Sequence, residues 1–432
     1  MSPINSFPGY EFVKIGPDNR PHNMYKGEDV GFGGYVYAEP GMYGRTVCFD
    51  VSGMHPASIR ALNCFGEYTK NFGDLVDARL AIKHKDFDAA RAMLGGKLAP
   101  YLDDESQAKE LTKALKIAVN SVYGLTSANF DNPFRDKRNV NNIVALRGAL
   151  FMCDLRHEVQ ARGFKVIHCK TDSIKVVEPN EEIWNFIINR AKEYGYQFEI
   201  EHIFEKICLV NDAVYIAKLA IDDPENPGEW TATGKQFAVP YVFKKLFSKE
   251  DIEFSDMCET MSVATALYLD ANEDLPEGEH NLQFIGKVGS FCPIKPGRGG
   301  AELLREGKDK DGNVKYSAAT GSKGYRWLES EMVKSLGRVG DIDRSYYDKL
   351  VNDAVDTISK YGDFEHFVSD DPVPDTYPWT TGESPDDLPW RMACGRDTCF
   401  GCPKLTRTGC TDGYDNSDFL SQIDESDAFM KR

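Results

Sequence analysis

The chain has 432 residues, of which 41% are hydrophobic and 28% charged, as is typical of a globular protein with two or three domains. Its 51 basic and 68 acidic residues give a net charge of −17, so a nucleic-acid partner would require a local basic surface. No apolar run approaches the ~18 residues that cross a bilayer, and the N-terminus has no signal-peptide pattern, so we expect a cytoplasmic protein without membrane contact.

Strand and helix patterns alternate over the first 230 residues. Residues 1–45, rich in Gly, Pro and Tyr, predict loops and turns, and the apolar run that follows predicts a strand at 45–51. Apolar residues at helical spacing predict helices at 71–98, at 105–124 with Gly124 as the C-cap, at 140–163 and at 181–195. A hairpin is predicted at 166–179, with residues 170–173 (KTDS) at its tip, and further strands at 196–204 and 206–219. This order indicates an α+β sheet into which a helical hairpin is inserted.

The pattern changes after Trp230, where we expect a domain boundary. Helical spacing predicts helices at 255–269, 324–337 and 345–362, separated by turns rich in Gly and Pro. Beyond Asp363 the chain is acidic and Pro-rich, which is typical of a linker. Four cysteines near the end could bind a structural zinc ion or an iron-sulfur cluster, or remain reduced thiols: Cys394, Cys399, Cys402 and Cys410.

Two carboxylates end neighbouring strand patterns. Asp50 ends the strand at 45–51, and Asp172 lies at the tip of the hairpin. An Asp at a strand end is more often a turn or cap residue, but two of them on adjacent strands can hold divalent ions through hard oxygen ligands. The pair therefore becomes informative only if a phosphate-binding partner accompanies it.

The two helices between these carboxylates carry candidate phosphate ligands. Lys116, Asn120 and Tyr123 share one face of the helix at 105–124, and Arg79 and Lys83 lie four residues apart on the preceding helix. A lysine, an amide and an aromatic ring on one face could hold the triphosphate, sugar and base of a nucleotide. The alternative is that both faces are simply solvated.

Three short stretches, in this order and spacing, resemble motifs A, B and C of the family B DNA polymerases: "DVSGMHPASI", "KIAVNSVYG" and "KTDS". "GFGGYV" at 31–36 resembles the Tyr/Gly-Gly element that precedes the palm in this family, and "TGKQFAVPYVFKKLF" stands where its chain enters the thumb. "GSFCPIKPGRGG" and "ATGSKGYRWLESE" resemble bacteriophage members, which implies a viral source and a host cytoplasm.

The resemblance implies a right-hand polymerase fold, with an antiparallel-sheet palm, helical-hairpin fingers and a mostly helical thumb. The corresponding domains are a pre-palm segment at 1–45, palm at 46–75 and 140–230, fingers at 76–139, thumb at 231–363, and an acidic linker with a Cys-rich tail at 364–432. No exonuclease motif precedes the palm, so we expect either an enzyme without proofreading or a separate exonuclease subunit.

The resemblance also implies template-directed DNA synthesis from dNTP on a primer-template, by two Mg²⁺ ions. Asp50, Asp172 and the backbone of Val51 would bind the ions. The expected nucleotide ligands are Arg79, Lys83, Lys116, Asn120, Tyr123 and, in the position of the sugar gate, His55. The expected DNA ligands are Lys170, Tyr215, Lys235, Lys244 and Lys245, and a processivity factor is a further expected partner.

Three departures from the family pattern leave alternatives open. Lys170 stands where motif C usually begins with Asp, which would suit a non-catalytic DNA-binding or assembly subunit on a degenerate polymerase fold. His55 replaces the usual Tyr, which would suit a primase-like enzyme that accepts rNTP. Ala213 replaces the lysine of the family's Lys-x-Tyr element, so only Tyr215 carries over.

Overall fold

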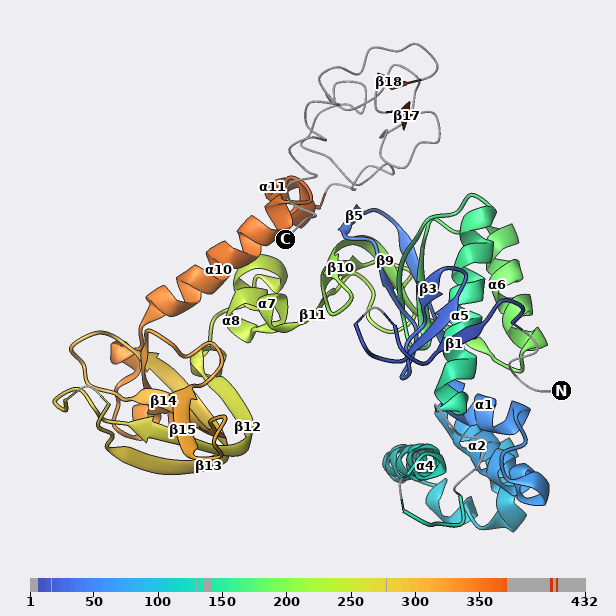
Figure 1. Ribbon diagram of the computed structural model, residues 1–432, viewed down its shortest axis with the longest axis horizontal. Helices are drawn as coiled ribbons and strands as arrows, with labels where there is room; N and C mark the ends of the chain where they lie inside the picture. The colour runs from blue at the N-terminus through green and yellow to red at the C-terminus, as the bar shows by residue number, and fades with distance from the viewer. Residues whose placement is uncertain are drawn as a thin grey trace.

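The computed structural model describes residues 7–16, 18–128, 130–134, 142–276 and 278–370, together with the backbone of two short strands, β17 (Leu405–Thr406) and β18 (Gly409–Cys410). The protein is α+β with curled antiparallel sheets. A central lobe carries a helical lobe on one side, and the largely helical residues 235–248 lead to a third lobe built on the strands between residues 259 and 329 (Figure 1). None of the helices in the described ranges is long and apolar enough to cross a membrane.

An eight-stranded sheet forms the central lobe, in the order β11-β10-β9-β6-β8-β7-β4, with β5 paired to β9. Strand β6 lies between β8 and β9 and is antiparallel to both. Its residues are buried on both faces except near Asp50, as expected for a central strand. The strands are β4 (Val36–Ala38), β5 (Gly41–Tyr43), β6 (Thr46–Val51), β7 (Val166–Lys170), β8 (Ser173–Val177), β9 (Phe198–Asn211), β10 (Val214–Leu219) and β11 (Trp230–Thr233).

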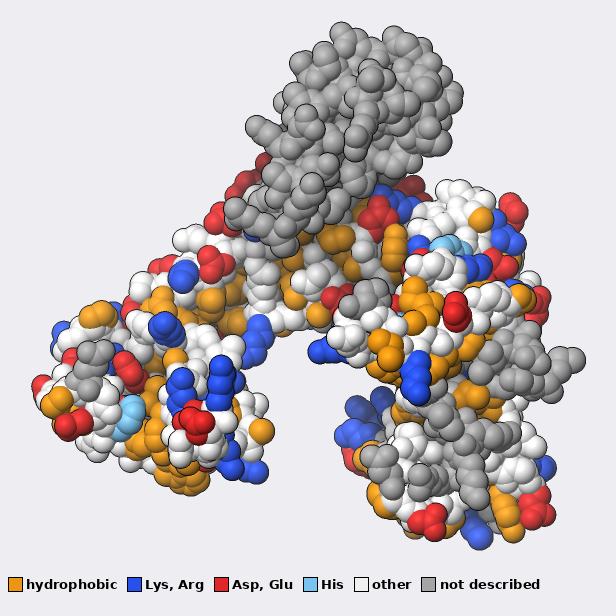
Figure 2. Space-filling view, viewed as in Figure 1, with side chains coloured by type: hydrophobic (Ala, Val, Ile, Leu, Met, Phe, Trp, Pro, Cys, Tyr) orange, Lys and Arg blue, Asp and Glu red, His pale blue; other side chains and the backbone are white. Residues whose placement is uncertain are grey.

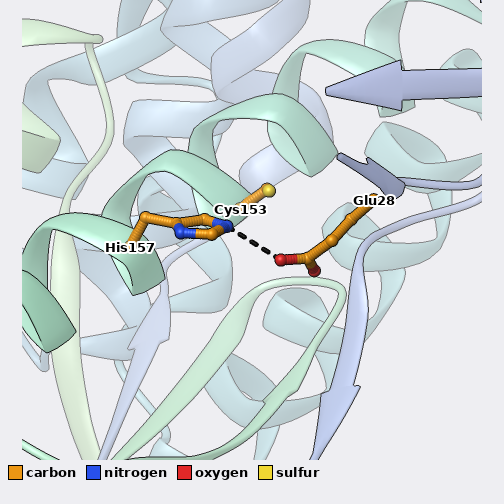
Figure 3. A group of neighbouring side chains, drawn as sticks. All are labelled: Glu28, Cys153 and His157. Carbon is orange, nitrogen blue, oxygen red and sulfur yellow. Dashed lines mark hydrogen bonds and ion pairs between the residues drawn. The ribbon is translucent and has the colours of Figure 1, made fainter. Parts of the chain in front are cut away.

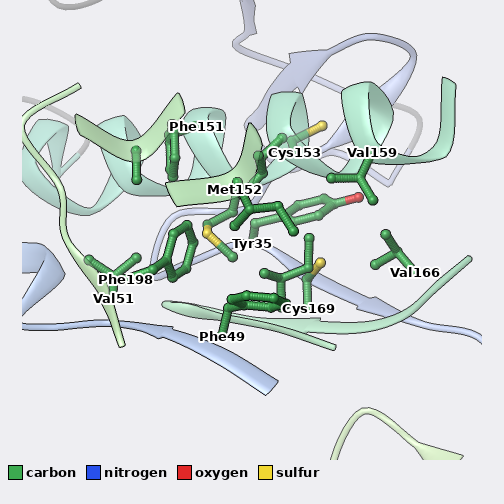
Figure 4. Close-up of a cluster of buried hydrophobic side chains, with 14 of the residues drawn as sticks. Tyr35, Phe49, Val51, Phe151, Met152, Cys153, Val159, Val166, Cys169 and Phe198 are labelled. Atoms are coloured by element: carbon green, nitrogen blue, oxygen red, sulfur yellow. The ribbon is translucent and has the colours of Figure 1, made fainter. Parts of the chain in front are cut away.

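Two helices cover one face of this sheet, α5 (Ile143–Ala161) and α6 (Glu181–Glu193). Phe49 and Phe198 from the sheet pack against Phe151 and Met152 from α5, with Tyr35 between the layers (Figure 4). Both helices and the hairpin β7–β8 lie where the hydrophobic periodicity predicts them, so these predictions are confirmed.

The expectation of loops alone over residues 1–45 is wrong. The described part contains β1 (Glu11–Val13), β2 (His22–Tyr25) and β3 (Glu28–Asp29), which form a three-stranded sheet, as well as β4 and β5. β4 and β5 pair with β7 and β9, which are distant in sequence, so no local pattern marks them as strands.

The helical lobe differs from the predicted helices at two points. The segment 71–98 is broken after Lys83, because Lys85 adopts a left-handed conformation with φ 61° and Asp86 caps the next helix by accepting from the Ala89 N–H. The second helix passes through Gly124 to Thr126. The elements are α1 (Met54–Ala61), α2 (Thr69–Lys83), α3 (Phe87–Ala92), α4 (Glu105–Thr126) and the 3₁₀ turns η2 (Gly66–Tyr68), η3 (Met93–Gly96) and η4 (Ala99–Tyr101).

The third lobe is a five-stranded antiparallel sheet in the order β15-β14-β12-β13-β16. The sheet consists of β12 (Glu259–Asp270), β13 (Leu282–Ile294), β14 (Glu302–Lys308), β15 (Val314–Ala318) and β16 (Arg326–Glu329). The connection to this sheet consists of α7 (Lys235–Ala238), α8 (Pro240–Phe243) and the π-helical turn η5 (Lys244–Ser248), whose buried side chains also pack against β9 and β10. The remaining short helical segments are η6 (Phe254–Met257), α9 (Ser330–Ser335) and η7 (Val339–Asp341). α10 (Arg344–Ser359) and α11 (Phe364–Val368) follow.

The expectation that this region is mostly helical is therefore wrong. The segment expected as a helix at 255–269 is mainly β12, and the one at 324–337 is β16 followed by α9; only α10 matches. The register of β12 against β13 shifts between Ser262 and Leu267, and this irregularity breaks the two-residue alternation so that its apolar residues imitate helical spacing. The expected linker also starts too early, because Phe367 of α11 is fully buried.

We predict that Trp327 is essential for the stability of the third lobe. Its side chain is fully buried and its indole N–H donates to the Ser322 carbonyl at 3.0 Å. Trp327→Ala should lower the free energy of unfolding by about 3–5 kcal/mol, whereas Phe284→Ala on the same sheet should cost below about 1 kcal/mol. The control side chain is 65% exposed. Urea denaturation followed by circular dichroism measures both, and equal losses would contradict the assigned core.

Candidate functional site

Asp50 and Asp172 are brought together where strands β6 and β8 of the central sheet meet the β7–β8 turn. Asp50 lies opposite Ser173 in the β6–β8 pairing, and the Val51 N–H donates to the Asp172 carbonyl at 2.9 Å. The turn that carries Asp172 is fixed from the other side, because the Thr171 N–H donates to the Tyr35 carbonyl at 2.9 Å. Two residues distant in sequence thus become neighbours through backbone pairing alone.

The glycine-rich segment before β4 is packed against the same turn. Gly34 has φ 154°, and a Cβ on it would lie 2.9 Å from the Thr171 side chain. Glycine is required there by this close approach. The "GFGGYV" stretch and the hairpin tip, which the sequence shows only as separate motifs, therefore form one structural unit.

Two further carboxylates, Glu199 and Glu201 on β9, lie close enough to act on Asp50. Burial and then the nearby charges of Asp172 and Glu201 raise the pKa of Asp50 to about 8. Burial also raises the pKa of Asp172, with Glu201 acting in the same direction and Lys116 against it. Glu199 faces Asp50 across the β6–β9 pairing. Hard oxygen donors with unbalanced negative charge are the donor set that divalent cations prefer, so these residues fit a Mg²⁺ site.

Glu199 and Glu201 were missed by the sequence analysis. They lie on β9 beside the catalytic candidates only because β9 pairs with β6, and the register shift between Cys48 and Phe49 sets their place. The one available signal was their spacing of two residues, which places both side chains on one face of a strand.

The helical lobe contributes the predicted cations. Lys116 is exposed on α4, and its positive charge lowers the pKa of Asp172 against the effect of burial. Lys83 lies at the end of α2, where its ammonium pairs with Glu199 Oε2 at 2.5 Å. Arg79 lies one turn earlier, and its Nε is buried without a hydrogen-bond partner.

His55 and Tyr123 form a stacked pair between α1 and α4. Their rings lie 4.1 Å apart with 12° between the planes, and Asn142 donates to the Tyr123 hydroxyl at 3.1 Å. Burial lowers the pKa of His55, and its Nδ1 is buried without a hydrogen-bond partner. Asn120 is exposed on α4 one turn from Lys116.

Lys170 points away from the carboxylate pair. Its ammonium donates to the Asp212 carbonyl at 2.8 Å, in the turn between β9 and β10. On β10, the ring centre of Tyr215 lies 5.3 Å from the ammonium of the buried Lys175. Lys175 was not singled out by the sequence. Although burial opposes its charge, Cys48, Tyr215 and Glu201 raise its pKa.

The three lysines expected to bind DNA near the start of the third lobe, Lys235, Lys244 and Lys245, differ in their surroundings. Lys235 and Lys245 are exposed, but Lys244 is paired with Asp256 at 3.0 Å. A groove of about 720 Å³ instead crosses β12, β14 and β15. Its basic side chains, apart from Lys235, were missed by the sequence analysis: Arg305, Lys308 and Lys315. Figure 2 shows Lys and Arg side chains on the inner sides of both arms, facing the hollow between them.

The cysteine tail lies outside the described residues. Cys394, Cys399 and Cys402 are not among them, and of Cys410 only the backbone in β18 is described. The expected zinc or iron-sulfur site is therefore untested by the structure.

One other group, within the described ranges, could bring three metal-ligand atoms together: Glu28, Cys153 and His157 (Figure 3). Arg156, however, contacts both Glu28 Oε1 and His157 Nε2, and the Tyr35 hydroxyl donates to Glu28 Oε2 at 2.6 Å. A guanidinium already supplies the positive charge there, so we assign this cluster to the packing of β3 against α5.

No family model matches the chain, and no curated protein matches it. Among solved structures the chain is similar to the family B DNA polymerase from the hyperthermophilic archaeon Pyrobaculum calidifontis, with a TM-score of 0.41 and 14% identity. The alignment covers 75% of this chain and 46% of that one, so the chain spans under half the length of that polymerase. A likeness of this size leaves the function to be argued from the chain's own residues.

We predict that Asp50 destabilises the metal-free protein. Its pKa is raised from the ordinary value of 3.8 to about 8, so the folded state loses stability as pH rises between these values. Asp50→Asn should therefore raise the free energy of unfolding by about 1–3 kcal/mol at about pH 8 in EDTA, and by less at about pH 5. Thermal denaturation measures this, with Asp348→Asn at an exposed position of α10 as the control. A less stable Asp50→Asn protein at pH 8 would contradict the clustering of like charges.

Proposed function

We propose that the chain is the polymerase portion of a family B DNA polymerase that extends a primer 3′-hydroxyl with dNTP under template direction. The observation that carries the proposal is the meeting of Asp50 and Asp172 on neighbouring strands. Each lies in a stretch that resembles a polymerase motif. Lys116, from the stretch that resembles motif B, lowers the pKa of Asp172 by its charge. Three segments that are separate in the sequence therefore contribute to one site.

In this proposal the central lobe is the palm, the helical lobe the fingers and the third lobe the thumb of a right hand. The arrangement of two arms rising from one sheet, with a hollow between them, supports this assignment (Figures 1 and 2). The thumb then differs from the expectation in being built on a sheet.

Asp50, Asp172 and the backbone carbonyl of Val51 would hold the two Mg²⁺ ions, which would lower the pKa of the primer hydroxyl and neutralise the leaving pyrophosphate. Arg79, Lys83 and Lys116 would bind the triphosphate, since phosphate oxygens attract cations on two facing helices. The His55–Tyr123 stack offers a flat surface for the sugar and base, beside Asn120. An exonuclease subunit, a processivity factor and a metal in the cysteine tail remain proposals.

Primer-template DNA would lie in the hollow, in contact with the groove on the third lobe. Lys235, Arg305, Lys308 and Lys315 supply the local basic surface that a chain of net charge −17 requires. Lys170, Tyr215 and Lys245 would be further DNA ligands in this proposal. Because Lys244 is paired with Asp256, we assign it to the packing of the thumb.

The non-catalytic alternative rests on Lys170 and is weakened by its geometry. The ammonium of Lys170 is occupied by the Asp212 carbonyl, so it does not neutralise Asp172. The rNTP alternative rests on His55, whose ring is smaller than the tyrosine of the family pattern and lies at the same position as that tyrosine.

We predict that Asp172→Asn abolishes primer extension, whereas Lys170→Asp leaves it within about threefold, because only the first change removes a metal ligand. The assay is extension of a labelled primer with Mg²⁺ and either dNTP or rNTP, so that it also tests sugar selection. Equal loss from both changes would overturn the role assigned to Lys170.

We predict that the groove governs DNA affinity. Replacing Arg305, Lys308 and Lys315 together by Gln should weaken duplex binding at least tenfold and reduce the salt slope by about 2–3 units, since each removed phosphate contact releases about one counterion less. A triple variant of the same net charge, Lys192→Gln, Lys334→Gln and Lys349→Gln, serves as the control. Fluorescence anisotropy at several salt concentrations measures both, and identical behaviour would remove DNA from this groove.

A further inference from the structure

The end of α2 is tied to strand β9 by one carboxylate. Lys83 Nζ lies 2.5 Å from Glu199 Oε2, and His84 Nε2 lies 2.8 Å from Glu199 Oε1. Both oxygens of Glu199 are thus used by two consecutive residues of the helical lobe. The carboxylate is 26% exposed, so the contact is partly shielded from water and open to competition by a soluble anion.

Glu199 is a neighbour both of Lys83 and of Asp50, one of the two proposed metal ligands. It is the β6–β9 pairing partner of Asp50, and the charge of Lys83 acts on both carboxylates. Burial alone would raise the pKa of Glu199, but the hydrogen bonds from Lys83 and His84 lower it, which keeps the group ionised. Arg79 one turn earlier has its buried Nε unpaired.

We propose that Glu199 is an internal competitor of the nucleoside triphosphate, because both would bind Lys83 and His84. This inference rests on the proposed function. Its carboxylate occupies, at Lys83 and His84, the place of phosphate oxygens and holds the fingers against the palm until a triphosphate displaces it. Glu199 then affects nucleotide specificity, because a ligand must carry enough negative charge to break the Lys83 ion pair and the hydrogen bond with His84. A self-contact populated nine-tenths of the time would weaken the apparent affinity about tenfold.

The test compares Glu199→Gln with Glu205→Gln. Glu205 lies on the same strand and also faces lysines, Lys206 at 3.9 Å and Lys218 at 3.7 Å, but does not contact α2. Glu199→Gln should tighten equilibrium binding of a non-hydrolysable dNTP analogue, measured by calorimetry, about 3–10-fold, and should lower the KM for dNTP by a similar factor. Inorganic pyrophosphate offers phosphate oxygens to the same two partners and should show a similar gain, whereas Glu205→Gln should change neither value.

Two further variants make the result decisive. Glu199→Asp keeps the charge but is too short to reach both partners, so an intermediate gain is expected even if the Gln variant folds poorly. In a Lys83→Met protein the ion pair between Lys83 and Glu199 is already absent, so Glu199→Gln should tighten analogue binding less than it does in the wild-type protein. A double-mutant cycle measures this difference.

The outcomes separate the two proposals. Wild-type protein that binds the analogue and extends primers, with no tighter binding in Glu199→Gln, would overturn the internal competitor and leave the polymerase standing. Loss of extension in Glu199→Gln with unchanged analogue binding would instead make Glu199 a metal ligand and also overturn it. Wild-type protein that neither binds nor extends would overturn the proposed function and the competitor with it.

Discussion

The site depends on the register of one strand. β6 is paired on both sides, with β8 and with β9, and this double pairing fixes which of its side chains leave the core. A slip of one residue would turn Asp50 into the layer where Phe49 packs against Trp184, and would bring Phe49 to the edge instead. Because Asp172, Glu199 and the turn held by Tyr35 are all placed relative to β6, no member of the site can be moved alone.

That register creates an electrostatic cost that the rest of the molecule offsets. Four carboxylates meet at one edge, and two of them, Asp50 and Asp172, have raised pKa values because burial and like charges disfavour their ionised forms. The compensation comes from three directions: Lys116 from α4, Lys83 from α2, and the buried Lys175 from below. An arrangement that remains short of positive charge while held in a rigid sheet is suited to binding cations and anionic ligands together.

Local patterns made much of the central lobe predictable. The hairpin β7–β8 and helices α5 and α6 follow regular periods, and so the neighbourhood of Asp50 and Asp172 could be inferred before the structure. Three features could not. The register shift in β12 imitated helical spacing, the short N-terminal strands pair with distant partners, and Glu199 and Glu201 gain their meaning only from the strand beside them. The basic groove likewise arises from the pairing of β14 with β15, which brings Arg305 opposite Ser317 and Lys315 opposite Gly307.

The acidic excess of the chain does not exclude a nucleic-acid surface, because charge acts over a short range in salt. The Debye length is about 8 Å at physiological ionic strength, so carboxylates on remote faces are screened from a phosphate in the groove. Among the described residues, the acid that lines the groove is Glu306, which accepts a hydrogen bond from the Tyr268 hydroxyl at 3.0 Å, whereas Arg305, Lys308 and Lys315 are exposed. A bound phosphate would therefore meet mainly cations, and the net charge of −17 would mainly slow the approach of DNA from a distance.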